Sequence, residues 1–221
     1  IGDGEIERAA DGAFEDDICI PSEFCNVGSE NCIDDMIDST FPEFAQHFNE
    51  PSYLSERAIL TPTNSTVAHV NSLIVERIPG ESQSYYSVDH AEDYPGTATE
   101  LNNSFRPEYL NSLSVPGLPT HELKLKVGVV VMLMRNLNQT LGLCNGTRMM
   151  VTRLLPNCDE CEVISGNFVG TKHFIPRMEI FPTDSKLPYK LMRKQMPLQI
   201  CYAMTIIKSQ GQSLKNVGLY L

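Results

Sequence analysis

The residues best suited to chemistry gather in one stretch, 203–213, with the sequence AMTIIKSQGQS. Apolar strand candidates stand on either side of it, at 197–203 and 217–221. The stretch collects hydroxyl, amide and amino groups around a glycine: Thr205, Lys208, Ser209, Gln210, Gly211 and Gln212. Such side chains donate hydrogen bonds to phosphates, and a glycine lets the backbone approach a ligand closely. The pattern predicts a phosphate-binding loop; by chemistry alone, a surface loop without a ligand is the alternative.

The rest of the chain offers no complete site for ATP or for a metal ion. No GxxxxGK[ST] stretch occurs, so the backbone cradle and the lysine that hold ATP phosphates are missing. Cys158 and Cys161 have the spacing of half a zinc site, but no second Cys or His pair lies at the expected distance. We therefore predict no metal site and no ATP hydrolysis by this chain alone.

A second set of elements must lie beside this loop. Residues 57–60 predict a short buried strand, and apolar residues at helical spacing over 67–78 predict a helix after it. Asn64 stands where the helix needs an N-cap, and Pro79-Gly80 ends the helix. Strand, tight loop and helix together form half of a βαβ unit.

The middle of the chain changes character twice. Residues 81–122 are polar and rich in Ser, Asn, Tyr and Pro, which indicates a loop-rich insertion. From 123 to 155 the sequence is rich in Val, Met, Leu and Thr, and the Asn145-Gly146 turn signal predicts two adjacent antiparallel strands. Further short strand candidates make a small barrel or a meander: 161–164, 172–175 and 178–181.

Charge is distributed unevenly along the chain. The net charge is -11, yet residues 1–56 carry 15 acidic and 1 basic side chain, whereas residues 124–221 carry 5 acidic and 13 basic. A basic second half suits a phosphate-backbone partner, with an ordinary solvated surface as the alternative. The first 54 residues predict an acidic connector of loop and one short helix at 33–41.

Length and composition exclude several classes of protein. With 221 residues and 42% hydrophobic content, the chain can bury a core. Its longest apolar run, 127–134, is far shorter than the roughly 18 to 20 residues of a membrane-spanning helix. The seven Cys are scattered and no secretory signal opens the sequence, so we expect reduced thiols and no secretion.

Three blocks of sequence resemble one family in the right order. TIIKSQGQS followed by LKNVGLYL resembles motif V of superfamily-one DNA helicases, with the petite-integration-frequency family and its Helitron transposon relatives as the best match. RAILTPTNSTVAHVN resembles the family's motif IV, and LKLKVGVVVMLMRNLNQTLGLCNGTRMMV resembles its inserted small β-barrel, the 2B domain. IGDGE and FPEFAQHFNEPSYLSE resemble the acidic connector of Helitron-type members.

This resemblance implies an α/β fold in three parts. Residues 55–80 and 197–221 would form part of a second RecA-like domain of the P-loop NTPase type. Residues 81–196 would be an insertion containing the 2B-type β-barrel, with its core at about 107–180. Residues 1–54 would be the acidic, partly irregular connector.

The resemblance also implies roles for single residues. Thr205, Lys208, Ser209, Gln210, Gly211 and Gln212 would couple DNA to the nucleotide cleft as motif V. Motif IV would contribute Thr61, Asn64 and Asn71 beside that cleft. The barrel's candidates for contacting DNA or buttressing the motor are Arg135, Asn136, Asn145 and Arg148. Arg135 has an ordinary surface position as its alternative.

The implied function is that of a C-terminal portion of an ATP-dependent DNA helicase, a hydrolase that unwinds DNA from 5′ to 3′. Its context would be DNA repair, recombination, telomere maintenance or Helitron transposition, in the nucleus or in mitochondria. The implied partners are single-stranded or forked DNA and a first RecA-like domain. That domain would complete the site for ATP and Mg²⁺, and no membrane is involved.

Two departures from the family pattern keep alternatives open. Ile207 stands where the family usually has His or Asn, so one hydrogen bond to DNA or to the cleft is lost. Because the sequence starts without Met and stops before motif VI, we expect a domain fragment of a longer helicase or a decayed, transposon-derived gene. The alternatives in function are a non-catalytic module that binds nucleic acid or protein, and an inert remnant.

Overall fold

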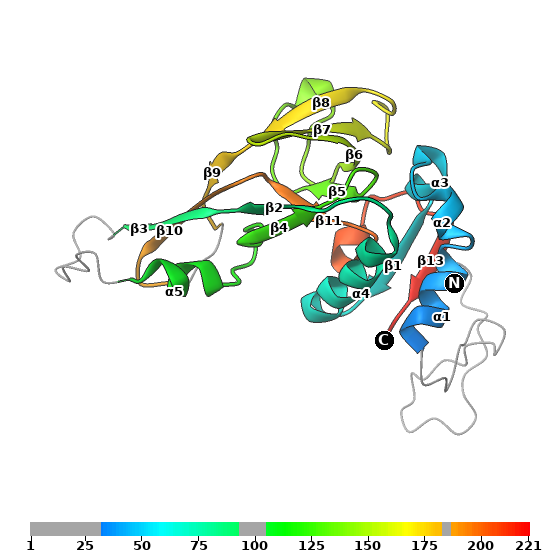
Figure 1. Cartoon of the computed structure of the whole chain (residues 1–221), viewed down its shortest axis with the longest axis horizontal. Helices are drawn as coiled ribbons and strands as arrows, with labels where there is room; N and C mark the ends of the chain where they lie inside the picture. Colours follow the sequence, from blue (N-terminus) through cyan, green and yellow to red (C-terminus); the bar gives the residue numbers. More distant parts are fainter. Residues whose placement is uncertain (1–31, 93–104, 183–186) are drawn as a thin grey trace.

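The computed structural model describes residues 32–92, 105–182 and 187–221, so the first 31 residues of the expected connector lie outside the described residues. The chain has three parts: a small parallel sheet with helices at one end, an antiparallel sheet above it, and an arm that extends away from both (Figure 1). Among the residues described, no helix is long and apolar enough to cross a membrane.

The parallel sheet has three strands in the order β12 (Ala203–Thr205), β1 (Arg57–Thr61) and β13 (Asn216–Leu219). The helices α4 (Asn64–Arg77) and α1 (Cys32–Thr40) pack against it (Figure 1). The predicted order of strand, tight loop and helix after residue 57 is confirmed, and so is the short helix expected at 33–41.

The start of α4 differs from the sequence prediction in one residue. Thr63, not Asn64, is the N-cap: its Oγ1 accepts the N–H of Thr66 at 3.3 Å, and Asn64 is the first helical residue. Either side chain is a good cap, so the sequence alone does not decide between neighbours. The helix then buries one apolar face, which includes Val70 and Ile74.

Two short helices, α2 (Phe44–His47) and α3 (Pro51–Ser55), lead from α1 into β1. Pro51 occupies the first turn of α3, where its missing N–H costs no hydrogen bond. Phe44 and Leu54 are buried in the same core as the parallel sheet.

The antiparallel sheet has five strands in the order β11 (Leu198–Ile200), β5 (Val130–Leu133), β6 (Arg148–Leu154), β7 (Cys158–Val163) and β8 (Lys172–Pro176). Strands β5 to β8 follow one another in sequence and in space, as a meander does. The two strands predicted on either side of the Asn-Gly turn are confirmed as neighbours.

The apolar run 197–203 is two strands rather than one. Residues 198–200 pair with β5 in the antiparallel sheet, and the chain then crosses to the parallel sheet as β12. The sequence-based division, which placed 197–221 wholly with the RecA-like part, thus separates β11 from the sheet in which it lies. A continuous apolar run does not reveal at which residue the chain changes sheet, because both strands contribute buried apolar residues, Leu198 in β11 and Ala203 and Met204 in β12.

The arm is built from the segment that the sequence predicted as loop-rich and from a strand near residue 190. It joins a two-stranded and a three-stranded sheet to one short helix: β2 (Gln83–Tyr86) with β4 (Glu122–Leu125), β3 (Val88–Glu92) with β10 (Lys190–Gln195) and β9 (Met178–Ile180), and α5 (Pro107–Ser112). A small core stabilises the three-stranded sheet and α5, with Leu110, Tyr189 and Leu191 among its residues. Strands β2 and β4 contribute Tyr85, Leu123 and Leu125 to the continuous core that the other two parts share.

Candidate nucleic-acid groove

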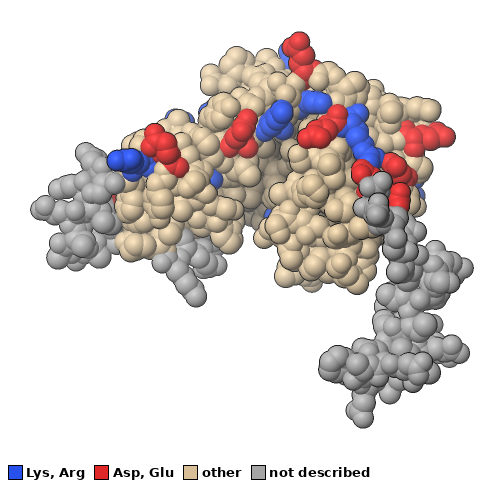
Figure 2. Space-filling model, turned by 60° about the horizontal axis from the view of Figure 1, so that its bottom comes forward, with Lys and Arg blue, Asp and Glu red and all other residues tan. Residues whose placement is uncertain are grey.

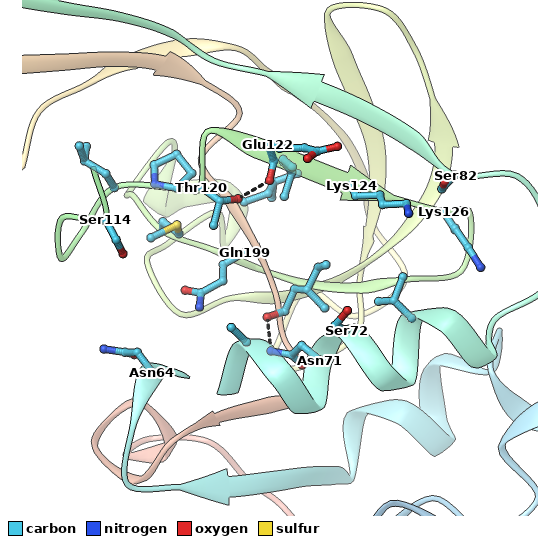
Figure 3. Close-up of a pocket in the computed structure, with 18 of the residues that line it drawn as sticks. Asn64, Asn71, Ser72, Ser82, Ser114, Thr120, Glu122, Lys124, Lys126 and Gln199 are labelled. Atoms are coloured by element: carbon cyan, nitrogen blue, oxygen red, sulfur yellow. Dashed lines mark hydrogen bonds between the residues drawn. The ribbon is translucent and has the colours of Figure 1, made fainter. Parts of the chain in front are cut away.

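A cleft of about 1000 Å³ separates α4 from the segment 114–124. Strand β11 and the side chain of Lys208 also line it. Side chains from α4 and from the opposite segment face one another across the cleft (Figure 3). Figure 2 shows one face of the molecule hollowed between its two lobes. The volume is at the upper end of the roughly 300–1,000 Å³ that small-molecule sites occupy, which leaves room for an extended ligand.

The topology of the parallel sheet brings two distant segments to this cleft. Strands β1 and β12 run parallel and end at Thr61 and Thr205, which are register partners. The loop into α4 and the 3-10 helix η3 (Ile206–Ser209) therefore leave the sheet from the same edge. Ligands of α/β proteins bind at the carboxyl ends of parallel strands for this reason. Asn64 and Lys208 thus line one cleft.

The buried Thr61 shapes the turn in front of α4. Its Oγ1 donates to the carbonyl of Thr63 at 3.0 Å and accepts the N–H of the same residue at 3.3 Å. This hydroxyl is therefore occupied by the backbone, and it fixes the entry of the helix whose first residue, Asn64, is exposed at the cleft.

Within the loop 205–213, Lys208 is the residue whose basic side chain lines the cleft. Its Nζ donates to Oε1 of Gln199 at 2.9 Å, which holds the amine at the cleft wall. Desolvation lowers the pKa of this amine below its usual value. Ser209 donates to the carbonyl of Ile206 at 2.7 Å and closes the 3-10 turn. Ile207 is 84% exposed, so the residue that departs from the family pattern projects into solvent.

Asn71 binds backbone rather than facing a ligand. Its Nδ2 donates to the carbonyls of Ile200 and Ala203, both at 3.1 Å, and its Oδ1 accepts the N–H groups of Tyr202 at 3.0 Å and Ala203 at 2.8 Å. The side chain is only 4% exposed. It fastens α4 to the crossover between the two sheets, so its contribution to the cleft is to hold one wall in place.

Of the two roles expected for Arg148, the structure supports buttressing. The side chain is fully buried, which leaves it unable to touch a DNA strand. Its guanidinium donates to four main-chain carbonyls, at 3.0 to 3.4 Å. Three of them, those of Leu54, Ser55 and Arg57, lie at or before the start of β1, and that of Cys201 lies in the crossover between β11 and β12. Arg148 lies on β6, so it ties the antiparallel sheet to the start of β1 and to the crossover.

The other three barrel candidates lie at turns. Arg135 donates to the carbonyls of Gly117, at 3.2 Å, and of Phe181. The Oδ1 of Asn136 accepts the backbone N–H of Asn145 at 2.7 Å and so braces the turn between β5 and β6. Asn136 and Asn145 are exposed, whereas Arg135 is half-buried. Arg135 therefore braces loops beside the cleft, which agrees with the buttressing role among the roles expected for it.

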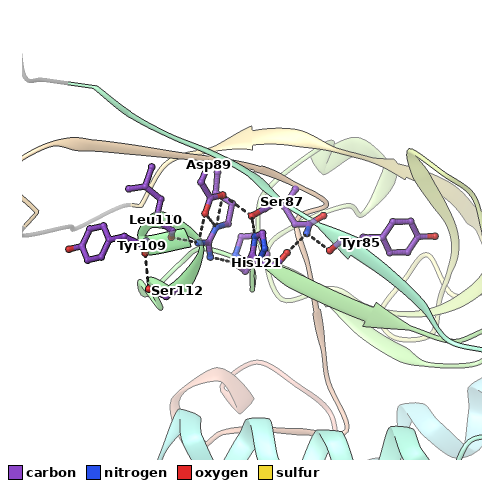
Figure 4. A network of polar contacts seen from close by, with 10 residues as sticks. Tyr85, Ser87, Asp89, Tyr109, Leu110, Ser112 and His121 are labelled. Atoms are coloured by element: carbon purple, nitrogen blue, oxygen red, sulfur yellow. Dashed lines mark hydrogen bonds and ion pairs between the residues drawn. The ribbon is translucent and has the colours of Figure 1, made fainter. Parts of the chain in front are cut away.

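The opposite wall of the cleft is held by a buried ion pair that the sequence did not reveal. Asp89 and Arg193 are 0% and 2% exposed, with Nη2 and Oδ2 at 2.6 Å. The same guanidinium donates to the carbonyls of Leu110, at 3.0 Å, and Pro119, at 2.9 Å (Figure 4). Leu110 precedes the wall segment 114–120 and Pro119 lies near its end, so Arg193 holds the segment on both sides.

Alternation within β10 is the signal that points to Arg193. Leu191, Arg193 and Gln195 are all buried, while the residues between them are more exposed. In a strand, every second residue faces the same side, so an Arg in phase with a buried Leu has to find partners inside the protein. Gln195 does so as well: its Nε2 donates to the carbonyls of Tyr85 at 2.8 Å and His121 at 3.1 Å.

Charges around the cleft are balanced. Its lining holds three Lys and three Glu: Lys124, Lys126, Lys208, Glu76, Glu81 and Glu122. Lys126 donates to the carbonyl of Ile78 at 2.6 Å. On the face shown in Figure 2, Lys, Arg, Asp and Glu mix along one edge, and most of the hollowed region is uncharged. The basic excess of the second half of the sequence is therefore not concentrated in the cleft.

Comparison with known proteins identifies the segment that forms the opposite wall and the centre of the antiparallel sheet. Residues 108–154 match the family described as DNA helicase Pif1, 2B domain. The ATP-dependent DNA helicase PIF1 of Homo sapiens is 30% identical to this chain over 165 residues, which are 70% of this chain and 22% of the relative. The chain is a relative of the Pif1 helicases. The Pif1 relative from Xenopus laevis is 26% identical over 190 residues, 86% of this chain and 27% of the relative. The chain thus spans about a quarter of the length of these curated Pif1 proteins.

Solved Pif1 structures share the fold. The Pif1 helicase from Candida albicans has a TM-score of 0.52 and 20% identity, and the match covers 85% of this chain and 46% of that one. Unliganded Pif1 from Bacteroides sp has a TM-score of 0.50 and 20% identity over 75% of this chain and 51% of that one. The mixed α/β architecture with its inserted antiparallel sheet is therefore the Pif1 arrangement.

The residues present do not form a site for ATP and Mg²⁺. The sequence contains no phosphate-binding GxxxxGK[ST] loop. Within the three described ranges, no group of three or more His, Cys, Asp or Glu side chains is placed to hold a metal ion. The cleft beside Lys208 is a candidate site for an extended strand, with α4, the segment 114–124 and β11 as its lining.

Proposed function

We propose that this chain forms the DNA-gripping C-terminal part of an ATP-dependent DNA helicase of the Pif1 type, which unwinds DNA from 5′ to 3′. Single-stranded DNA occupies the cleft between α4 and the segment 114–124. The observation that carries the proposal is that the motif IV helix, the Lys208 loop and the Pif1 2B segment all line one cleft. ATP and Mg²⁺ are held in the full helicase with a first RecA-like domain as partner.

Two relatives of this fold support DNA as the ligand. One solved structure, with a TM-score of 0.51, concerns DNA unwinding at forked dsDNA by two coordinating Pif1 helicases. Another, from Bacteroides with a TM-score of 0.50, is a complex with ADP-AlF3 and ssDNA. Both are under 25% identical to this chain, so the argument for the cleft rests on its own residues.

The lining favours binding that does not depend on base sequence. Lys208 and the amide and hydroxyl groups of α4 suit the sugar-phosphate backbone. Aromatic rings, on which bases stack, are absent among the described residues that line the cleft. With only three Lys in the lining, we expect moderate affinity that decreases as salt increases.

Fluorescence anisotropy with a labelled single-stranded oligonucleotide tests the proposal at several salt concentrations. Lys208→Ala should weaken binding and reduce the slope of log affinity against log salt by roughly 0.7, the value for one phosphate contact on a single strand. The matched control is Lys172→Ala, because Lys172 is an exposed residue of β8 paired with Glu162 at 3.8 Å and does not line the cleft. Equal effects of the two substitutions would refute the assignment of the cleft.

A location in the nucleus or in mitochondria goes with this proposal. Imaging of a fluorescent fusion in cells checks it, since a protein that acts on DNA has to reach a compartment that holds DNA.

A further inference from the structure

The loop 205–213 is anchored to the antiparallel sheet just before its start. The crossover that leads into β12 is bound by Arg148 of β6, which donates to the carbonyl of Cys201 at 3.4 Å. The hydroxyl of Tyr202 accepts the N–H of Val130, the first residue of β5, at 3.0 Å. The strand that delivers the loop is therefore fixed by the inserted sheet as well as by its own parallel neighbours.

The far end of the loop is anchored to the same sheet by one side chain. Gln212 donates from Nε2 to the carbonyl of Gly146 at 3.0 Å. Gly146 belongs to the turn between β5 and β6, so this hydrogen bond spans the boundary between the two sheets. The backbone N–H of Gln212 also donates to the carbonyl of Ser209 at 3.0 Å. One residue thus contacts both the turn of the sheet and the 3-10 turn that carries Lys208.

The turn that receives Gln212 is well supported. The N–H of Gly146 donates to the carbonyl of Leu133 at 2.8 Å, and Asn136 accepts the N–H of Asn145 at 2.7 Å. Gly146 has φ +91°, a conformation that other residues rarely adopt, and a Cβ there would lie 3.8 Å from Nε2 of Gln212. The geometry of the turn therefore fixes where the carbonyl of Gly146 points.

Between its two anchors the loop has few contacts that hold it. Ile207 is 84% exposed, and Gly211, with φ +84°, has no atom within 4 Å of the position that a Cβ would occupy. Its internal hydrogen bonds fix the shape of the 3-10 turn, not the place of that turn relative to the cleft. Among the described residues, the side chain of Lys208 makes the hydrogen bond that crosses from the loop to the cleft, to Gln199 of β11.

We propose that Gln212 is a positioning residue that joins the 144–147 turn of the antiparallel sheet to the loop 205–213, so that this sheet sets the place of Lys208 in the cleft. Gln212 acts through the loop and does not itself contact DNA. Displacement of the 144–147 turn is then transmitted to Lys208. The test of DNA binding rests on the function proposed above, whereas the hydrogen-exchange test does not.

Hydrogen exchange of the free chain is the first measurement, on wild type, Gln212→Ala, Asn136→Ala and the control Gln139→Ala. Gln139 is an exposed glutamine of the 3-10 helix η2 (Gln139–Leu141) that does not line the cleft. We expect both Gln212→Ala and Asn136→Ala to speed exchange in 206–212, while Gln139→Ala leaves it unchanged. If Gln212→Ala speeds exchange only at its own amide, or Asn136→Ala leaves 206–212 unaffected, the turn and the loop are not coupled.

A double-mutant cycle of binding to a labelled oligothymidylate is the second measurement. Loss of one hydrogen bond from Gln212 should weaken binding by about three- to tenfold. In a Lys208→Ala background the further loss should be within about twofold, because residues that act through one another are not additive. Additive losses would show that Gln212 contacts DNA directly. If wild type binds no DNA, the proposed function fails, and the exchange experiment still decides the role of Gln212.

Discussion

Asn71 and Ala203 form two hydrogen bonds with each other: the N–H of Ala203 donates to Oδ1 at 2.8 Å, and Nδ2 donates to the carbonyl of Ala203 at 3.1 Å. One side chain thus pairs with both polar groups of a residue 132 positions away. The contact fixes α4, which lines the cleft, to the first residue of the strand that leads into Lys208. One amide therefore fastens the helix on one side of the cleft to the strand that precedes the Lys208 loop.

Replacing this amide should destabilise the protein. Asn71→Ala leaves four backbone groups of a buried crossover, two carbonyls and two N–H groups, without their hydrogen bonds, and we expect a loss of about 2 to 4 kcal/mol in the free energy of unfolding. Asn64→Ala is the matched control, since Asn64 is exposed and lies on the same helix. Urea unfolding followed by circular dichroism measures both. A similar cost for the two substitutions would contradict the role given to Asn71.

The buried Arg148 should matter for stability in the same way. Arg148→Met keeps much of the volume but leaves four carbonyls without their donor, and we expect a loss of about 3 kcal/mol or more. Arg153, on the same strand, has a side chain 59% exposed and paired with Glu160, so Arg153→Ala should change stability by less than about 1 kcal/mol. Chemical denaturation of both variants checks the contrast. A small effect of Arg148→Met would mean that the two sheets are held together by apolar packing alone.

Breaking the Asp89–Arg193 pair should loosen the far wall of the cleft. Asp89→Asn leaves a buried guanidinium without its counter-charge, which typically costs about 3 to 5 kcal/mol. Limited proteolysis should then cut within 113–120 faster than in wild type, because Arg193 holds the carbonyls of Leu110 and Pro119. The double variant Asp89→Asn, Arg193→Met should recover part of the loss, since no charge is left buried. Strict additivity of the two substitutions would argue against the pair.

Because of Asp159, the free energy of unfolding should decrease as the pH rises above about 4. Its carboxyl is fully buried, and among the described residues its Oδ2 has no hydrogen-bond partner, so burial raises its pKa despite the hydrogen bond from Tyr85 at 2.7 Å. In the unfolded chain the group ionises near pH 4. As the pH rises above that value, ionisation favours the unfolded state, and the free energy of unfolding falls until the folded carboxyl also ionises.

The variant Asp159→Asn removes this charge and keeps an oxygen to accept from Tyr85. Its free energy of unfolding, relative to wild type, should therefore increase from pH 4 to pH 8. Thermal unfolding of the two proteins across that range measures the difference. A difference independent of pH would show that the carboxyl titrates at the same pH in both states.

Periodicity and turn signals were enough to predict several local elements, although not the helix and most of the strands of the arm. Helical spacing over 67–78 gave α4, and the Asn-Gly pair gave the hairpin of β5 and β6, because these patterns depend on residues close in sequence. Motif resemblance also predicted the 2B segment, and the family match at 108–154 confirms that prediction. The type of fold and the family were thus readable from the residues themselves.

The tertiary structure decided which polar residues face ligand and which face backbone. Arg148, Asn71 and Arg193 have the side chains of surface or binding residues, yet each is buried and bound to carbonyls far away in sequence. The cost of burying a charged or amide group is offset only by partners that other segments bring to it, and those segments meet only in the folded chain. The same holds for Gln212, whose partner Gly146 lies 66 residues away on another sheet.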